Sequence, residues 1–158
     1  MSAKISDLID PARVALHLPA TDARSAIEQA AALLESHADV KNFAGFLSDL
    51  HERAALDTVC LGNGLALPHA RTPHVRKIVL AIGRTEQPVT FSGGTESARL
   101  LFVVGTPKSS PGDYLQVVGA LCRLMKNPHD RDVLMAARTP REFLDAVITI
   151  EDRSLATA

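Results

Sequence analysis

The stretch Leu100-Leu101-Phe102-Val103-Val104 is an uninterrupted apolar run of strand length. A second run, Ile78-Val79-Leu80-Ala81-Ile82, has the same character, and Val89-Thr90-Phe91 is a weaker candidate strand before a predicted turn at residues 92–95. A strand with one solvated face alternates apolar and polar residues, so the two continuous runs predict strands that are buried on both faces. We therefore expect them at the centre of a sheet that helices cover on each side.

The N-terminal third predicts one strand and two helices. Residues 14–18 have strand character, and Thr21 or Asp22 can cap the following helix, because their side-chain oxygens accept hydrogen bonds from its first turn. A turn-rich loop at residues 58–64 and a short apolar strand at residues 65–67 come after the second helix. The helices are predicted from apolar residues at helical spacing, namely Ala26, Ile27, Ala30, Leu33 and Leu34, and then Phe43, Phe46, Leu47 and Leu50.

The last third of the chain is predicted to be helical. One helix covers residues 114–125, a short one follows Pro128, and the last begins at Pro140 with Thr139 as its cap. The order β-α-α-β-β-β-β-α-α-α predicts an α/β fold with a mixed central sheet flanked by helices. A chain of 158 residues is long enough for one buried core, so we expect a single domain over residues 1–158.

The composition of the chain indicates which classes of partner and which cellular compartment to expect. Lys and Arg total 17 against 18 Asp and Glu, a net charge of −1, which predicts neither nucleic acid nor an anionic membrane as partner. No run approaches the roughly 18 apolar residues that span a bilayer, and the N-terminus lacks the pattern of a signal peptide. Cys60 and Cys122 are far apart, as expected for free thiols in a reducing compartment. We therefore expect a cytoplasmic protein that is not inserted in a membrane.

His69 is the histidine with the most informative surroundings. It follows a predicted strand and a proline, which places its side chain at the rim of the sheet. A neutral imidazole is a nucleophile that can accept a phosphoryl group, and this chemistry depends mainly on positioning and positive charge. Arg53 and Arg71 are the nearest basic candidates, because a guanidinium can bind two phosphate oxygens at once. We expect four other histidines at the surface: His17, His37, His51 and His129.

Other site chemistries find no support in the sequence. His69 and His74 are five residues apart with Pro73 between them, and no Cys or acidic residue nearby completes a metal site. The chain has no Gly-x-x-x-x-Gly-Lys loop, no Gly-x-Gly-x-x-Gly fingerprint and no Gly-x-Ser-x-Gly elbow. The sequence therefore predicts neither a metal nor a cofactor.

The segment Leu61-Gly62-Asn63-Gly64-Leu65-Ala66-Leu67-Pro68-His69-Ala70-Arg71 closely resembles the phosphorylation-site segment of certain IIA domains. These are the fructose/mannitol-type IIA domains of the bacterial phosphotransferase system, and the nitrogen-regulatory branch is the nearest to this chain. The likeness covers nearly the whole chain. It includes the spacing from Arg53 to the Gly62-Asn63-Gly64 loop, the apolar strand Leu100 to Val104, and the closing helices with Thr139-Pro140-Arg141-Glu142-Phe143-Leu144. It implies a IIA-type fold and a phosphohistidine phosphotransferase component in which His69 accepts phosphate from a small HPr-type carrier. It also implies that Arg53 lies near the phosphate.

The resemblance also implies the partners. Sugar-specific members pass the phosphate to a IIB domain, whereas nitrogen-regulatory members control partner proteins through their phosphorylation state. We therefore expect a phosphoryl carrier that acts in sugar uptake or in regulation, with an HPr-type carrier and either a IIB domain or a regulated target as partners. The alternative is a catalytically weakened regulatory module that keeps the fold and controls its partner by contact.

The chain departs from the family pattern around His69. The family usually has a second active-site histidine at the start of the helix where this chain reads Tyr114-Leu115-Gln116, and Thr58-Val59 stands where a Ser-Thr pair is usual. Tyr114 can donate a hydrogen bond to phosphate, yet it cannot titrate near neutral pH. Our predicted site is therefore His69 with phosphate-binding or supporting residues around it, and its phosphoryl transfer is slower than in two-histidine members, or lost. These supporting residues are Arg53, Thr58, Arg71, Tyr114 and Gln116.

Overall fold

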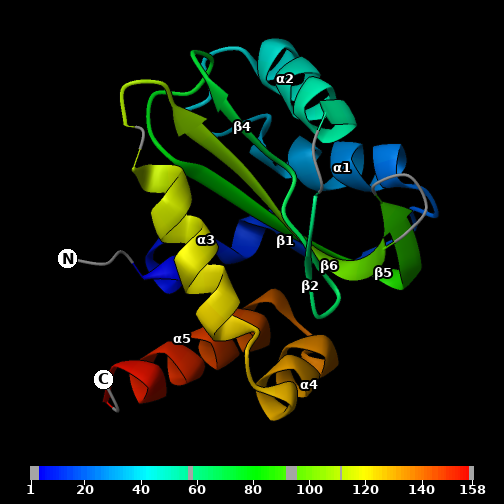
Figure 1. The fold of residues 1–158 in the computed structure, drawn as a ribbon, viewed down its shortest axis with the longest axis vertical. Helices are drawn as coiled ribbons and strands as arrows, with labels where there is room; N and C mark the ends of the chain where they lie inside the picture. The colour runs from blue at the N-terminus through cyan, green and yellow to red at the C-terminus, as the bar shows by residue number, and fades with distance from the viewer. Residues whose placement is uncertain (1–3, 57–58, 92–95, 111, 157–158) are drawn as a thin grey trace.

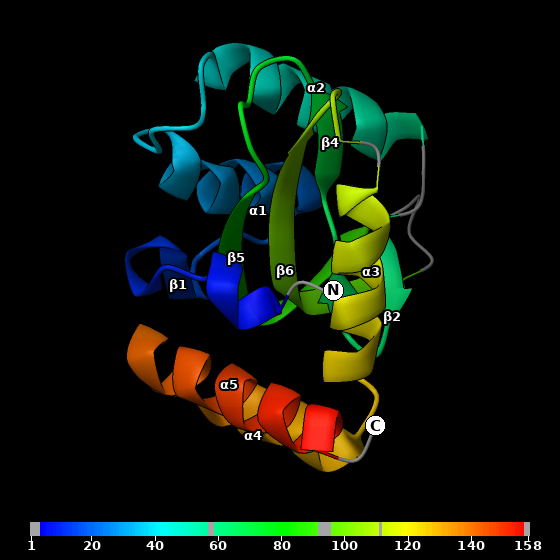
Figure 2. The same cartoon turned by 90° about the vertical axis from the view of Figure 1, so that its left-hand side faces the viewer.

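The computed structural model describes residues 4–56, 59–91, 96–110 and 112–156. Within these residues a six-stranded sheet lies between two groups of helices (Figure 1, Figure 2). The strands are β1 (Val14–Leu18), β2 (Cys60–Gly62), β3 (Leu65–Ala66), β4 (His69–Thr72), β5 (Val79–Phe91) and β6 (Glu96–Pro107). The helices are α1 (Ala23–Ala31), α2 (Phe43–Leu56), α3 (Asp113–Leu124), α4 (Pro128–Ala136) and α5 (Pro140–Ala156), with 3-10 turns at Ile5–Leu8, Pro11–Arg13 and Ala32–Leu34.

The two long strands β5 and β6 form the centre of the sheet, as their apolar runs predicted. The strand order is β1-β5-β6-β3-β2, and β4 also pairs with β6. β5 and β6 are antiparallel, whereas β1 runs parallel to β5, and β3 and β4 run parallel to β6. The sheet is therefore mixed, and the predicted α/β fold class is confirmed.

Alternate residues of β6 face two different cores. Phe102 and Val104 pack in the cluster that includes α3 and α5, while Leu101 and Val103 pack in the cluster that includes α1 and α2. This alternation is the period of two that a strand imposes on its side chains. Figure 2 shows α1 and α2 on one side of the sheet and α4 and α5 on the other. Each fully buried apolar side chain contributes about 1.5–3 kcal/mol to the stability of the fold, so β6 stabilises the packing on both faces of the sheet.

β3 and β4 lie end to end along the same edge of β6. Leu65 pairs with Leu100 and His69 pairs with Val104, so one register continues through both strands. Pro68 stands between the strands and has no N–H to donate. Its carbonyl oxygen nevertheless accepts a hydrogen bond from the Val104 N–H at 3.0 Å. The register on β6 therefore fixes the position of His69.

Parts of the sheet differ from the sequence prediction. Val89-Thr90-Phe91 is not a separate strand but the end of β5, beyond an irregularity in its pairing with β6. Residues 60–62 and 69–72 form the short strands β2 and β4, which the sequence did not predict. Strands of three or four residues are too short to show a period, and their pairing partners are distant in sequence. The predicted turn at residues 92–95 lies outside the described residues.

The helix starts follow their capping residues. Asp22, and not Thr21, caps α1, because its Oδ1 accepts a hydrogen bond from the Ser25 N–H at 2.8 Å. The Thr139 hydroxyl oxygen accepts one from the Glu142 N–H at 3.1 Å at the start of α5. Both predicted helix starts are therefore confirmed. Over the described part of the chain, the structure contains no helix with the length and apolar character needed to cross a membrane.

Candidate functional site

A pocket of about 480 Å³ lies along β4, at the end of the sheet where β6 ends. Figure 1 and Figure 2 place β4, α2 and the N-terminal end of α3 at this same end of the molecule. Three parts of the chain thus converge on one cavity: α2, β4, and the end of β6 together with the start of α3. Its lining residues come from α2, β4, α3 and the segment that ends β6: Asp49, Glu52, Arg53, Leu56, His69, Ala70, Arg71, Thr106, Lys108 and Tyr114.

His69 is the first residue of β4 and is partly exposed. Along this strand Ala70 and Thr72 are buried, so His69 and Arg71 lie on the opposite, accessible side. The His69 Nδ1 atom lies 2.9 Å from the carbonyl oxygen of Leu67. A carbonyl oxygen only accepts, so Nδ1 donates its proton and Nε2 carries the lone pair of the neutral ring. Nε2 is therefore the nitrogen that can attack an electrophile.

Tyr114, the second residue of α3, lies directly against His69. The two ring centroids are 4.4 Å apart and the ring planes meet at 29°, which is a stacked arrangement. Gln116 is exposed two residues further along α3 and does not line the pocket. Two residues of helix correspond to a rotation of about 200°, so the two side chains leave the helix in nearly opposite directions. Tyr114, and not Gln116, therefore occupies the position beside His69.

Three basic side chains line the pocket. Two of them are the predicted candidates Arg53, which comes from α2, and Arg71, which comes from β4; the third, Lys108, follows directly after β6. The Arg71 guanidinium donates a hydrogen bond from Nη2 to the Lys108 carbonyl oxygen at 3.1 Å, which joins the two segments. The pocket thus offers cationic groups next to a nucleophilic ring. Thr58 lies outside the described residues, so its predicted role remains a prediction.

The sequence comparison decides the family. Residues 7–149 match the family described as "Phosphoenolpyruvate-dependent sugar phosphotransferase system, EIIA 2". The chain belongs to this EIIA family. The resemblance noted from the segment around His69 is thereby confirmed.

The relatives of this chain include both sugar-specific and nitrogen regulatory proteins. A nitrogen regulatory protein of Bradyrhizobium diazoefficiens is 26% identical over 139 residues, which are 87% of this chain and 88% of that protein. The crystal structure of nitrogen regulatory protein IIA-Ntr from Neisseria meningitidis superposes with a TM-score of 0.81 at 25% identity, covering 90% of this chain and 98% of that one. The 2-O-alpha-mannosyl-D-glycerate-specific EIIABC component of Escherichia coli K12 is 30% identical over 105 residues, 65% of this chain. The match spans only 16% of that larger protein.

The EIIA pocket also contains residues that sequence reasoning missed. Asp49, Glu52 and Leu56 line it together with Arg53, and these four positions follow the i, i+3, i+4, i+7 spacing of one helix face. That spacing is visible in the sequence and could have identified them once Arg53 was chosen. The Asp49 carboxylate accepts a hydrogen bond from the Thr72 hydroxyl at 2.6 Å, which links α2 to β4.

The Gly62-Asn63-Gly64 turn of the EIIA motif does not touch this pocket. All three residues have positive φ, at 90°, 56° and 76°, which explains the two glycines. The turn connects β2 to β3, and His69 lies four residues beyond Leu65, about 13 Å further along the edge of β6. Asn63 and Gly64 instead line a separate cavity of about 330 Å³ near Arg131. The turn therefore shapes the β2–β3 hairpin, whereas the pairing of β3 and β4 with β6 fixes the position of His69.

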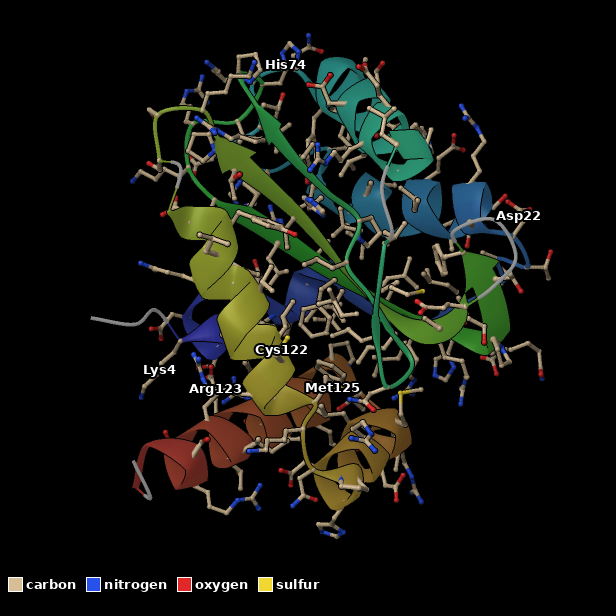
Figure 3. The ribbon with its side chains drawn as sticks, in the orientation of Figure 1. Lys4, Asp22, His74, Cys122, Arg123 and Met125 are labelled. Carbon is tan, nitrogen blue, oxygen red and sulfur yellow. The ribbon has the colours of Figure 1, made fainter. Side chains whose placement is uncertain are left out.

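The remaining histidines serve structural contacts or face solvent. His51 was predicted at the surface, but its side chain is only 16% exposed and its Nε2 lies 3.0 Å from a Glu28 carboxylate oxygen. It lies on α2, and packing of α2 against α1 covers it. His74 is 3.9 Å from the Asp49 carboxylate and lies at the end of the molecule beyond β4 (Figure 3). Among the described residues no group of three or more His, Cys, Asp or Glu could hold a metal ion.

Proposed function

We propose that this EIIA protein carries a phosphoryl group on Nε2 of His69. The observation that carries the proposal is the hydrogen bond from Nδ1 to the Leu67 carbonyl oxygen, which leaves the lone pair on Nε2. Arg53, Arg71 and Lys108 line the same pocket and can bind phosphoryl oxygens. Fixed geometry with positive charge is what phosphoryl transfer requires of a protein.

The proposed transfer of the phosphoryl group needs no cofactor. The Nε2 lone pair of His69 forms the new N–P bond, and the bond from phosphorus to the donor nitrogen breaks with its electron pair returning to the donor imidazole. The Nδ1 proton stays on His69 and keeps its hydrogen bond to the Leu67 carbonyl oxygen. The product is a phosphoramidate whose ring is positively charged and whose three phosphoryl oxygens face the pocket cations.

The donor in this proposal is a phosphohistidine on a small carrier protein of the HPr type. The recipient is either a IIB domain or a regulated target protein, because the relatives include sugar-specific and nitrogen regulatory proteins. Such carriers draw on phosphoenolpyruvate in the cytoplasm, so the proposal places this protein in that compartment. Thr58 and Gln116 belong to the proposed site as supporting residues; Thr58 lies outside the described residues, and Gln116 does not line the pocket.

A regulatory binding module is the second candidate function. Tyr114 stands where the family usually has a second histidine, and it cannot supply a titratable charge near neutral pH. The Bradyrhizobium nitrogen regulatory protein also matches over 88% of its own length, in contrast to the multidomain EIIABC protein. In this alternative the chain keeps the pocket but controls its partner by contact, without turnover of phosphate.

Intact-mass measurement tests the proposal. The protein is incubated with phosphoenolpyruvate, the general phosphotransferase enzyme and an HPr-type carrier, and we expect one phosphoryl group that is stable in base and lost in acid. His69→Ala abolishes this uptake, while the matched control His129→Ala, at an exposed position on α4, leaves it unchanged. Undiminished labelling of His69→Ala would show that His69 is not the nucleophile. If the parent protein takes up no phosphate, the binding-module function is the one that stands.

A further inference from the structure

The stacked pair of His69 and Tyr114 has a consequence for the phosphorylated state. We propose that the aromatic ring of Tyr114, and not its hydroxyl group, holds the His69 imidazole in the orientation for transfer and stabilises the positive charge of the phosphorylated ring. Tyr114 is thus a positioning residue. This inference rests on the proposed function, because it assigns Tyr114 a part in that same transfer.

The hydrogen bond to the Leu67 carbonyl oxygen fixes only one atom of the His69 ring. The outer torsion of a histidine side chain is broad and has two roughly equivalent settings, so a hydrogen bond at one edge of the ring does not by itself set the tilt of the ring plane. The Tyr114 ring, with its centroid 4.4 Å away and its plane at 29°, restricts that tilt from one face. Both contacts restrict the direction in which Nε2 points.

The phosphorylated ring gains a second benefit from the stack. With Nδ1 still protonated and Nε2 bonded to phosphorus, the His69 ring is a delocalised cation. The face of an aromatic ring carries negative electrostatic potential and attracts a cation within about 6 Å of its centroid. The phenol ring of Tyr114 lies inside that range. It therefore favours the charged product over the neutral starting ring.

The fold holds Tyr114 in place independently of any ligand. Tyr114 is partly buried and packs against the core cluster formed by α3, α5 and one face of the sheet. Its neighbour Leu115 is 69% exposed and points away from that core. A side chain supported by packing is a rigid platform, so the stack exists before phosphate arrives. Leu115 offers a matched control for effects on carrier docking.

Three variants separate the ring from the hydroxyl. Tyr114→Phe keeps the ring, Tyr114→Leu removes it, and Leu115→Ala changes only the neighbouring surface. Phosphate uptake is timed in single turnovers over a range of carrier concentrations. We expect Tyr114→Phe to stay within about twofold of the parent, and Tyr114→Leu to lower the maximal rate about 3- to 10-fold with little change in the half-saturating carrier concentration. Leu115→Ala leaves the maximal rate unchanged.

Proton NMR of the unphosphorylated protein gives a readout that does not depend on transfer. The Tyr114 ring current shifts the carbon-bound ring protons of His69 upfield, and we expect this shift in the parent and in Tyr114→Phe but not in Tyr114→Leu. Equal losses of rate in Tyr114→Phe and Tyr114→Leu would assign the effect to the hydroxyl and overturn the inference. An unchanged rate in Tyr114→Leu overturns it as well. If the parent takes up no phosphate, the proposed function fails, and the NMR shift alone decides whether Tyr114 holds the ring.

Discussion

Replacing Arg71 with Gln tests whether the pocket cations bind the transferred phosphoryl group. Arg71 lies on the same side of β4 as His69, and its Nη2 donates to the Lys108 carbonyl oxygen at 3.1 Å, which anchors the guanidinium at the pocket wall. A hydrogen bond from a charged donor contributes about 1.5–3 kcal/mol, against about 0.5–1.5 kcal/mol for a neutral one. The difference of about 1–1.5 kcal/mol corresponds to an uptake rate about 5- to 13-fold lower in Arg71→Gln.

Arg76→Gln is the matched control for this experiment. Arg76 is also an exposed arginine near the end of β4, and it also donates one hydrogen bond to a backbone carbonyl, that of Ala38 at 2.6 Å, but it does not line the pocket. The assay is the rate of phosphate uptake from the HPr-type carrier at low and at high salt. Because Arg71 is exposed, salt screens its charge, and the difference between the two variants narrows as salt rises. Equal rates for Arg71→Gln and Arg76→Gln at low salt would refute the reasoning.

The other predictions concern groups outside the pocket. Burial lowers the pKa of His37, so below about pH 6.5 the unfolded chain binds a proton more readily than the native state does, and stability falls as the pH drops. Between about pH 7 and about pH 5, the melting temperature of His37→Asn should therefore fall less than that of the parent. An equal fall in both proteins would contradict this. Arg84 is 6% exposed, and its guanidinium donates hydrogen bonds to two carbonyl oxygens at the end of α4, those of Leu134 and Ala137, at 2.9 and 2.7 Å. Arg84→Met should therefore lower the free energy of unfolding in urea by about 2–4 kcal/mol, and an unchanged midpoint would count against this role. Burial raises the pKa of the Cys60 thiol, so an alkylating reagent should modify the exposed Cys122 on α3 (Figure 3) and leave Cys60 unmodified. Rapid modification of both cysteines would instead show that β2 opens and exposes Cys60.

Several features of this protein were determined by the sequence itself. The apolar runs at residues 78–82 and 100–104 predicted the buried centre of the sheet, because continuous hydrophobicity is stable only where both faces are covered. Asp22 and Thr139 marked helix starts, because capping is a contact within three residues. His69 stood out through its own neighbours, so its candidacy also needed only local information.

Only the tertiary structure decided how the site is assembled. β4 is a strand because it pairs with β6, and nothing in the four residues themselves predicts this. Tyr114 reaches His69, and Gln116 does not, because the docking of α3 on the core sets the rotation of that helix. Lys108 and Asp49 join the pocket through contacts between distant segments. Local capping and periodicity are readable in a sequence, whereas pairing and packing between distant segments arise only when the chain folds.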